Sequence, residues 1–377
     1  MKIRSIHLHQ VGPIEERVID LTNKWTDGLH ERILLTGPNG SGKSAVLRAM
    51  AGLWRLLGHW LQSPDISKNM PGQLRGWMFD HAGAIALIVA DAPGMPGDCG
   101  IFYGDSLAFQ KISHKADFWI GEKIKKSGRT GALDKMRYLH GNANYVELLH
   151  RNTWDQLQTW AEAHRRLQLT TDNAHSPKSD TPNVIYLEAE ERRWIMPGQK
   201  LEQLIPDDPR QQWCVTYKPE ANWQGQLEAS LLALKTLDPS RYADVLEDLN
   251  KFLAGKRIRF QPTPDLRLAV DVDAAASSAQ SMTARGQTSH TLDELSAGER
   301  QVLVQIYLIS RWLQPGGIVL LDEPDLHLHP SLIPMLLARV ETIVAGRGGQ
   351  LIITSHLPEI WRMYETKALR VKLGGDL

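Results

Sequence analysis

The residue types between positions 37 and 44 could bind a phosphate group. The segment reads GPNGSGKS and matches the pattern G-x-x-x-x-G-K-[ST] of the P-loop. Glycines leave backbone N–H groups open to an anion, and the helix expected after the loop points its partially positive N-terminus at the same place. We expect the lysine to reach the β- and γ-phosphates and the serine hydroxyl to bind Mg²⁺. The predicted ATP-binding residues are Gly37, Pro38, Asn39, Gly40, Ser41, Gly42, Lys43 and Ser44.

Two acidic residues at positions 322 and 323 follow directly after the apolar run IVLL. An apolar strand that ends in two carboxylates supplies what a phosphate site needs beside a P-loop. We expect Asp322 to hold the water shell of Mg²⁺ and Glu323 to polarise the attacking water. The same half of the chain carries the hexapeptide LSAGER at 295–300 and a histidine, His356, after another apolar run.

A buried parallel sheet with helices on its faces would position these residues. Residues 33–35, 318–321 and 350–354 are short apolar runs of the kind found in parallel strands. Residues 45–61 have the apolar spacing of a helix that begins at the P-loop, and LSAGER opens a second amphipathic helix that runs to position 312. The pattern therefore predicts an α/β fold.

The remaining chain is predicted to mix strands and helices. We expect hairpin-like strand pairs, single strands, helices and one flexible linker. The strand pairs lie at 2–9 with 15–21, 101–103 with 107–112, and 256–261 with 266–272; the single strands at 84–90 and 184–187; the helices at 145–169, 227–237 and 242–253; and the linker at 274–284.

The composition is that of a globular protein. The chain has 377 residues, of which 42% are hydrophobic and 23% charged, with a net charge of zero. It therefore lacks a global basic field for nucleic acid. Its two cysteines, Cys99 and Cys214, form no CxxC pair, which favours a reducing, cytoplasmic location. No run reaches the length of a membrane span, and we expect no membrane partner.

The order of these motifs resembles the ABC-type ATPase family. The hexapeptide matches the signature motif, LLDEP matches the Walker B strand with its catalytic glutamate, Asp325 matches the D-loop, and His356 matches the switch histidine. The resemblance implies that Glu323 and His356 are catalytic and that Ser44 and Asp322 hold Mg²⁺. The signature residues that it implies are Leu295, Ser296, Ala297, Gly298 and Glu299.

The resemblance also implies an architecture and an assembly. It implies an ABC-type ATPase head, with mixed and parallel β-sheets around the P-loop, and a large, mostly helical insertion. We expect an ATPase lobe at 1–122, the insertion at 123–284 and a second ATPase lobe at 285–377. Family members form a head-to-tail homodimer, in which the signature of one subunit covers the γ-phosphate of ATP bound at the P-loop of the other.

One family motif has no clear match in the sequence. The family has a glutamine after the P-loop half that senses Mg²⁺, and Gln62, Gln73 and Gln110 are candidates. We favour Gln110 because it ends a strand-like stretch.

Two features, the insertion and the sequence DEPDLHLHP, indicate which branch of the ABC-type ATPase family the chain resembles. The insertion is too long for the compact nucleotide-binding domain of a transporter, and it lacks long heptads and a central CxxC. DEPDLHLHP resembles the variant typical of RecF-like and OLD-like ATPases, which act in DNA repair and in defence against phage and plasmids. No Toprim nuclease sequence follows His356, which predicts a separate effector protein such as a nuclease.

Three alternatives to an effector-controlling ATPase remain open. The chain could be a self-contained DNA-processing nuclease-ATPase, a binding clamp timed by nucleotide, or a transporter ATPase. DNA as a partner is supported only by the branch and by the basic run KIKKSGR at 123–129, whose simpler interpretation is a solvated loop. The acidic residues at 188–191 read as a solvated or salt-bridged face rather than a nuclease cluster.

Overall fold

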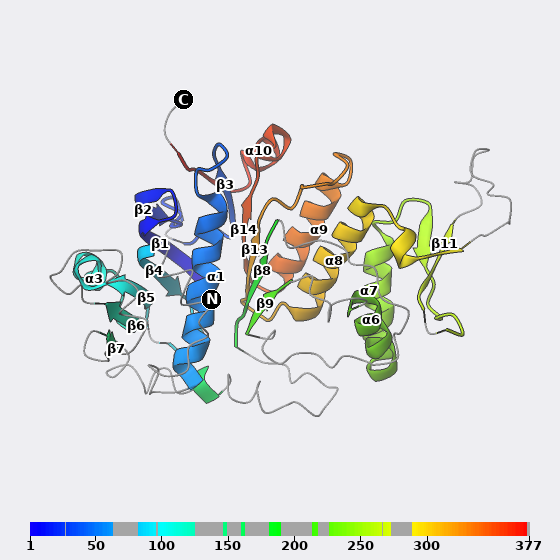
Figure 1. Cartoon of the computed structure of the whole chain (residues 1–377), viewed down its shortest axis with the longest axis horizontal. Helices are drawn as coiled ribbons and strands as arrows, with labels where there is room; N and C mark the ends of the chain where they lie inside the picture. The colour runs from blue at the N-terminus through cyan, green and yellow to red at the C-terminus, as the bar shows by residue number, and fades with distance from the viewer. Residues whose placement is uncertain are drawn as a thin grey trace, which may run out of the picture.

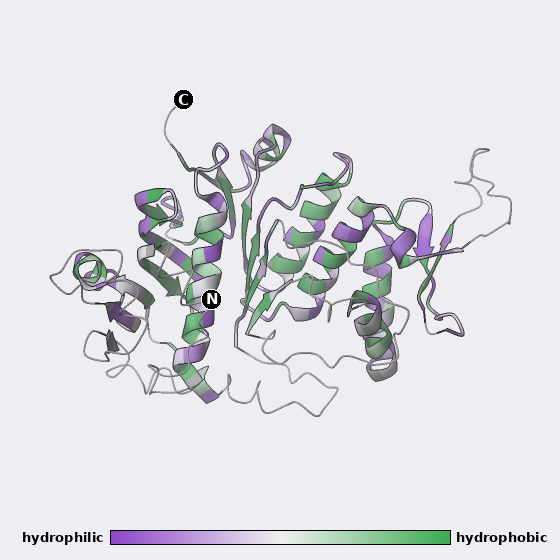
Figure 2. Cartoon of the chain, viewed as in Figure 1, coloured by the Kyte–Doolittle hydropathy of each residue, from purple (hydrophilic) through white to green (hydrophobic). Residues whose placement is uncertain are grey.

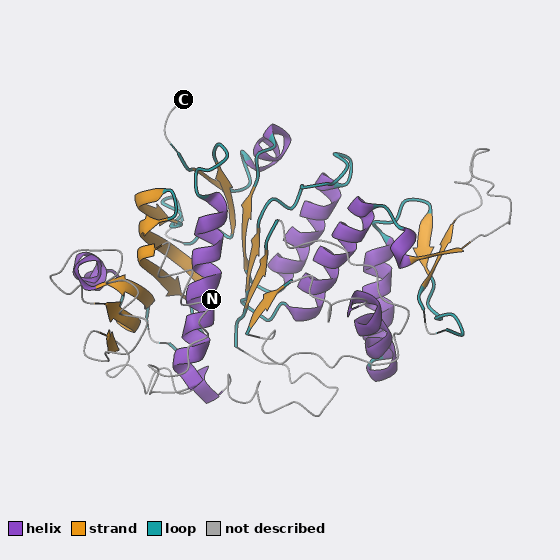
Figure 3. Ribbon diagram, viewed as in Figure 1, coloured by secondary structure: helices purple, strands orange, loops and turns teal. Residues whose placement is uncertain are grey.

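The structure is a computed structural model in which two large sheets lie on either side of one long helix. Figures 1 and 3 show the layers in order: a mostly antiparallel sheet, helix α1, a parallel sheet, helices α8 and α9, helices α6 and α7, and a small outer sheet. The described residues are 1–26, 28–62, 82–95, 97–124, 146–148, 160–162, 181–189, 213–217, 226–265, 267–272 and 289–374.

The central sheet is parallel throughout, with the strand order β15-β3-β14-β13-β8-β9. Because the strands are parallel, their carboxyl ends meet at one edge, where ligands of open α/β sheets bind. The P-loop, the acidic pair at 322–323 and the segment that leads to His356 all start from this edge. The strands are β3 Arg32–Thr36, β8 Val184–Leu187, β9 Cys214–Thr216, β13 Ile318–Leu321, β14 Gln350–Thr354 and β15 Leu369–Lys372.

The two faces of the parallel sheet pack against different helices. Ile318 and Leu320 belong to the core around α1, whereas Val319 and Leu321 belong to the core around the other helices. This alternation follows from the two-residue period of a strand. Helix α1 therefore lies on one face, and α8, α9 and α10 on the other (Figure 1). Their bounds are α1 Lys43–Gln62, α8 Ala297–Trp312, α9 Ile333–Gly346 and α10 Pro358–Tyr364.

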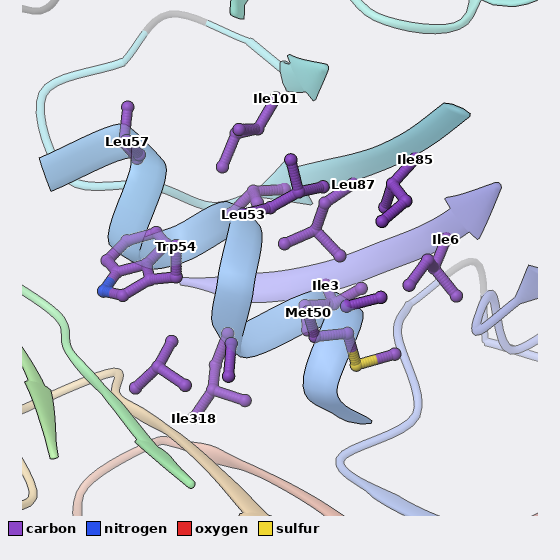
Figure 4. Packing of buried hydrophobic residues seen from close by; sticks show 14 of the residues in the cluster. Ile3, Ile6, Met50, Leu53, Trp54, Leu57, Ile85, Leu87, Ile101 and Ile318 are labelled. Carbon is purple, nitrogen blue, oxygen red and sulfur yellow. The ribbon is translucent and has the colours of Figure 1, made fainter. Parts of the chain in front are cut away.

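A mostly antiparallel sheet covers the other side of α1. Its order is β2-β1-β4-β5-β6-β7, with β5 and β6 parallel, so it is a mixed sheet. Leu53, Trp54 and Leu57 of α1 pack against Leu87 and Ile101 of this sheet (Figure 4). The strands are β1 Lys2–Val11, β2 Ile14–Asp20, β4 Ala82–Ala90, β5 Cys99–Asp105, β6 Phe118–Ile124 and β7 Val146–Leu148.

A buried glutamine ties the two large sheets together. The Gln350 side chain accepts a hydrogen bond from the Ile3 N–H at 2.8 Å and donates to the Ile3 carbonyl at 3.1 Å and the His30 carbonyl at 2.8 Å. Its exposure is 0%, and a buried amide costs stability unless it is fully hydrogen-bonded. The bonds therefore fix β1 against the base of β14.

The outer layer leads directly into the LSAGER segment. Strands β10, β11 and β12 form an antiparallel sheet, and β12 runs into a short 3₁₀ helix and then into α8. Asn250 of α7 holds β10, because its side chain accepts from the Ile258 N–H at 2.7 Å and donates to the Ile258 carbonyl at 3.3 Å. The bounds are α6 Gln226–Leu237, α7 Pro239–Asn250, β10 Lys256–Ile258, β11 Ala269–Val272, β12 Ser289–Thr291 and η6 Leu292–Glu294.

Two predicted elements differ in the structure. Residues 107–112 form helix α3 (Ser106–Ile112), followed by the 3₁₀ turn η2 (Ser113–Lys115), rather than the second strand of a hairpin. The Asp105 carboxylate accepts the Leu107 N–H at 3.0 Å and so starts the helix. Residues 146–148 are strand β7, not part of a helix, because they pair with β6.

The other predicted strands and helices within the described residues are present. The α/β fold is confirmed, with one parallel and one mixed sheet. Figure 2 shows hydrophobic residues along the strands between the helical layers. Strand β8 of segment 123–284 lies beside β13 in the central sheet, while the predicted domain limits stay a prediction. The linker at 274–284 and positions 125–129 of the basic run lie outside the described residues. None of the described helices has the length and apolar character needed to cross a membrane.

Candidate functional site

The P-loop has a backbone that only glycine adopts easily. The φ angle is 154° at Gly37, 78° at Gly40 and 93° at Gly42. A Cβ atom on Gly37 would lie 2.2 Å from the Leu373 carbonyl oxygen, and one on Gly42 would lie 2.7 Å from Cγ1 of Ile14. The end of β15 and the start of β2 therefore press on the loop from two directions and leave room only for hydrogen at these positions.

Lys43 lies over the loop that precedes it. Its Nζ donates to the carbonyl of Gly37 at 3.1 Å and to that of Pro38 at 3.0 Å, and the residue is 4% exposed. Burial lowers the pKa of Lys43, while the negative charges of Glu323 and Asp322 act in the opposite direction. A buried ammonium at the start of a helix suits binding of a phosphate anion.

Ser44 and Asp322 meet at the carboxyl edge of the parallel sheet. The Ser44 hydroxyl donates to Oδ1 of Asp322 at 3.0 Å, and the Thr354 hydroxyl donates to the same oxygen at 2.6 Å. Asp322 is 2% exposed. The structure thus brings together the start of α1 and the ends of β13 and β14.

These oxygen atoms fit a magnesium ion. Two neighbouring ligands of an octahedral ion with bonds of about 2.1 Å lie about 3 Å apart. Ser44 Oγ and Asp322 Oδ1 have this separation, 3.0 Å, and both are the hard oxygen donors that Mg²⁺ prefers. Ser44 would bind the ion directly, and Asp322 would hold it or one of its waters.

Glu323 and His356 contact each other beside this cluster. Glu323 Oε1 lies 2.5 Å from His356 Nε2, and the side chains are 22% and 32% exposed. Glu323 has a φ of 45°, which is unusual for a residue other than glycine, and its N–H donates to Oγ1 of Thr354 at 2.9 Å. Thr354 therefore contacts both acidic residues. Left-handed residues that are fixed by a neighbour in this way are common at functional sites.

The predicted signature residues form the N-terminus of α8. Leu295 is buried, and Ser296 caps the helix by accepting the Glu299 N–H at 3.2 Å, while the Glu299 carboxylate accepts the Ser296 N–H at 2.8 Å. Ser296 and Ala297 are exposed, and Gly298 is half-buried. An exposed, capped helix start of this kind presents N–H groups to an anion from outside the chain.

The loop that follows Glu323 connects this helix start to the acidic pair. A Cβ atom on Gly298 would lie 3.4 Å from the His327 carbonyl oxygen. Asp325 accepts the Leu328 N–H through its own carbonyl at 3.0 Å, and Gln305 of α8 donates to the Pro324 carbonyl at 3.4 Å. The predicted D-loop therefore packs on α8.

The P-loop and the signature lie apart within one chain. Helix α1 and helix α8 pack on opposite faces of the parallel sheet, and Figure 1 shows β13, β14 and α9 between their N-termini. A nucleotide held by the P-loop of this chain would not contact Ser296 of the same chain.

Gln110 does not lie with the other predicted site residues. It is an exposed residue of α3, which packs on β5 and β6 at the outer end of the antiparallel sheet (Figure 1). Gln73 lies outside the described residues, as does the side chain of Gln62. The Mg²⁺-sensing role of Gln110 stays a prediction that the geometry does not favour.

Sequence reasoning did not assign Thr354 and Glu188 to the site. Thr354 was only the last residue of an apolar run. Glu188 directly follows Leu187, whose carbonyl accepts the Asp322 N–H at 3.0 Å, and Glu188 forms an ion pair with Arg48 of α1. The signal that could have found Glu188 is its place after an apolar run, the same place that Asp322 has in β13.

Two family models match separate parts of the chain. A family model described as "AAA domain, putative AbiEii toxin, Type IV TA system" matches residues 229–361, and a second, described as "AAA domain", matches residues 1–61. These matches fall on the signature and acidic-pair half and on the P-loop half.

Two curated relatives match over short segments. The chain is 36% identical over 103 residues to "Retron Ec83 probable ATPase" of Escherichia coli, which covers 24% of this chain and 19% of the relative. It is 37% identical over 89 residues to an "Uncharacterized ABC transporter ATP-binding protein" of Methanocaldococcus jannaschii, which covers 22% of this chain and 16% of the relative. The chain thus matches less than a fifth of the length of either relative.

Solved structures with weak similarity include SMC and ABC proteins. An SMC head bound to the C-winged helix domain of ScpA has a TM-score of 0.44 and 13% identity, over 99% of this chain and 94% of that one. A dimeric ATP-binding cassette bound to ADP and Pi has a TM-score of 0.38 and 10% identity, over 98% and 94%.

The two family models and the short matches to a retron's probable ATPase and to an ABC transporter ATP-binding protein fit an ABC-type P-loop ATPase of the RecF/OLD-like branch, as the sequence predicts.

Proposed function

We propose that the chain binds ATP with Mg²⁺ at the P-loop and hydrolyses it to ADP and phosphate. One observation carries this proposal: Ser44, Asp322, Thr354, Glu323 and His356 form an unbroken series of contacts. The series joins the residues expected to bind the metal ion to those expected to act on water. Such an arrangement places a phosphate group and its attacking water side by side.

The residues divide the chemistry between them. When bound, Mg²⁺ would neutralise charge on the phosphates. Lys43 would exchange its carbonyl partners for phosphate oxygens. Glu323 would accept a proton from water as the water oxygen bonds to the γ-phosphorus and the bond to ADP breaks. His356 would leave Glu323 Oε1 and donate to the γ-phosphate, which stabilises its negative charge.

The separation of the P-loop from the signature residues within one chain supports a homodimer. Because α1 and α8 lie on opposite faces of the sheet, the exposed N-terminus of α8 needs a phosphate bound to another chain. Two copies arranged head to tail would place Ser296 of each copy on the nucleotide of the other. Loss of the γ-phosphate would then remove the bridge between the copies and separate them.

The dimer would control a separate effector protein in defence against phage and plasmids or in DNA maintenance. Support comes from the family description, which names a toxin and a toxin–antitoxin system, and from the similarity to a retron's probable ATPase. Residues of the insertion would contact the trigger or the effector.

The test of hydrolysis compares three variants of the purified chain. Lys43→Ala should abolish nucleotide binding, and Glu323→Gln should retain binding but lower kcat by about a hundred-fold or more, because the general base is lost. Glu365→Gln, an exposed control at the end of α10, should keep the activity of the parent. Normal hydrolysis by Glu323→Gln would refute the catalytic assignment.

A cell-based assay shows whether control of the effector requires ATP hydrolysis or only ATP binding. If the biological effect survives Glu323→Gln but not Lys43→Ala, nucleotide binding rather than hydrolysis controls the effector, as in a clamp. If both changes abolish the effect, turnover is required.

A further inference from the structure

Two basic residues of the β10–β11 hairpin hold the segment that leads into the signature. Lys256, the first residue of β10, bonds both carboxylate oxygens of Glu299 at 2.9 and 3.0 Å. Arg267, just before β11, bonds Oδ2 of Asp293 at 2.9 Å. Glu299 and Asp293 lie on either side of Ser296 in the sequence. The hairpin therefore contacts the signature segment on both sides of its capping residue.

The contact of Lys256 reaches the helix cap itself. Glu299 is the residue whose carboxylate accepts the Ser296 N–H, so the same side chain bonds the hairpin and the cap. The pKa of Glu299 is lowered, because its bonds to Lys256 and Ser296 outweigh the effect of burial. Glu299 thus stays charged, and Lys256 fixes it in the geometry that the cap requires.

The buried residue Glu228 holds Arg267 in the position from which it bonds Asp293. The Arg267 Nε bonds both oxygens of Glu228 of α6 at 2.9 and 3.0 Å, and Glu228 is 2% exposed. Glu228 also accepts the Leu268 N–H. A guanidinium that bridges two carboxylates has one allowed orientation, unlike a lysine ammonium. Asp293 is therefore tied through Arg267 to the helical layer.

A third bond closes the arrangement at the start of α8. Arg300 donates to the Asp293 carbonyl at 3.1 Å, so a shift of Asp293 would move the first turn of the helix. By contrast, the ion pair of Arg259 and Asp271 is exposed, at 46% and 45%, and joins only the residue after β10 to β11. The β10–β11 hairpin thus carries one ion pair that reaches the signature segment, Arg267 with Asp293, and one exposed pair that does not, Arg259 with Asp271. The second pair can serve as a control.

We propose that Lys256 and Arg267 are positioning residues, which hold the N-terminus of α8 in the orientation needed to bind the nucleotide of a second chain. The proposal deepens the proposed dimer and rests on it for its functional consequence. Neither residue touches the P-loop nucleotide in this account.

The first readout is hydrogen exchange of the amides at 298–300 in the nucleotide-free chain. Asp293→Asn keeps the shape of the side chain but removes the charge, and it should speed exchange about ten-fold, since charge-assisted bonds are roughly twice as strong as neutral ones. Lys256→Met should do the same. The controls Asp271→Asn and Lys251→Met remove exposed charges near the hairpin and should leave these amides unchanged. Unchanged exchange in Asp293→Asn and Lys256→Met would overturn the proposal.

The second readout is the MgATP concentration that gives half-maximal dimerisation in a Glu323→Gln background. Asp293→Asn should raise it about ten-fold, with the affinity of the monomer for a fluorescent nucleotide unchanged, because the P-loop face is untouched. Arg267→Lys should have an intermediate effect, because the single ammonium group of lysine replaces a guanidinium group that can bond two carboxylates at once. Equal midpoints for Asp293→Asn and Asp271→Asn would overturn the proposal.

The two readouts distinguish a failure of the positioning role from a failure of the proposed dimer. If the Glu323→Gln parent binds MgATP but does not dimerise, the proposed dimer fails, and the exchange rates alone decide whether the hairpin positions α8. If the parent dimerises and the exchange rates do not respond, the dimer stands and the positioning role fails.

Discussion

Ser44 Oγ donates a hydrogen bond to Oδ1 of Asp322 across 3.0 Å and so joins two residues that are 278 positions apart. Folding of the parallel sheet thus brings together the two oxygen atoms of the candidate magnesium site. Thr354 supports it from the neighbouring strand at 2.6 Å. A site held in this way needs little rearrangement when MgATP binds.

The first prediction concerns Thr354, which the sequence did not indicate. Thr354→Val keeps the shape but removes the hydroxyl that bonds Asp322 and Glu323, so both lose a buried partner. Because such a loss is worth about 1–3 kcal/mol, kcat should fall about ten- to a hundred-fold. Thr342→Val, which removes an exposed bond within α9, is the matched control for steady-state hydrolysis. Equal rates for the two variants would contradict the role of Thr354.

The second prediction concerns the shape of the P-loop. Gly37→Ala places a Cβ atom 2.2 Å from the Leu373 carbonyl oxygen at a φ of 154°, so the loop must shift. Calorimetry should show loss of nucleotide binding and a lower melting temperature. Gly346→Ala, at the end of α9 with no atom within 4 Å, should raise the free energy of unfolding by about 0.5–1 kcal/mol. Normal ATP binding by Gly37→Ala would show that the loop is not the site.

The third prediction compares Glu188 with Gln110 as the residue that affects Mg²⁺. Glu188 follows the strand beside Asp322, whereas Gln110 lies on α3. Glu188→Gln should raise the Mg²⁺ concentration for half-maximal activity about three-fold, because it removes a negative charge from the end of the strand beside Asp322. Gln110→Ala should leave it unchanged. The opposite result would restore the sequence-based choice of Gln110.

The fourth prediction concerns the two cysteines. Burial raises the pKa of the Cys99 thiol to about 12 and also raises that of Cys214. A thiol-specific reagent at pH 8 should therefore label neither residue in the native protein and both after unfolding. Rapid labelling of either native thiol would contradict the packing.

The same shift has a consequence for stability. The folded state retains the Cys99 proton above pH 9, where an unfolded thiol ionises. The free energy of unfolding should therefore be unaffected by this group below about pH 9 and fall as the pH rises toward 12. Denaturant titrations of the parent and of Cys99→Ala across this range should differ in slope.

The motifs and the apolar strands could be predicted because their signals are local. Parallel strands are buried on both faces and read as continuous apolar runs, such as ILL before the P-loop and IVLL before Asp322. The glycine-rich loop and the capped start of α8 likewise carry their own residue types. The P-loop and the acidic pair could thus be assigned to one site from the chain alone.

The other features of the fold and of the candidate site depend on tertiary packing, which no local sequence pattern shows. A short run such as 107–112 fits a strand or a helix, and the cap by Asp105 and the contact of Phe109 with Trp119, at 5.2 Å between ring centroids, decide for the helix. The role of Thr354 requires that β14 lie beside β13, and the pairs of Arg48 with Glu188 and of Arg267 with Asp293 join distant segments. The strand order of the sheet supplies this information.

The head-to-tail dimer is tested most directly by the mass of the Glu323→Gln protein in light scattering, with and without MgATP. We expect a monomer without nucleotide and twice that mass with MgATP. We expect a return to monomer when Ser296→Arg is added, because the bulky cation would block the signature residues. Nucleotide binding by the same sample is measured in parallel. A mass that stays at one chain although MgATP is bound would contradict the head-to-tail dimer.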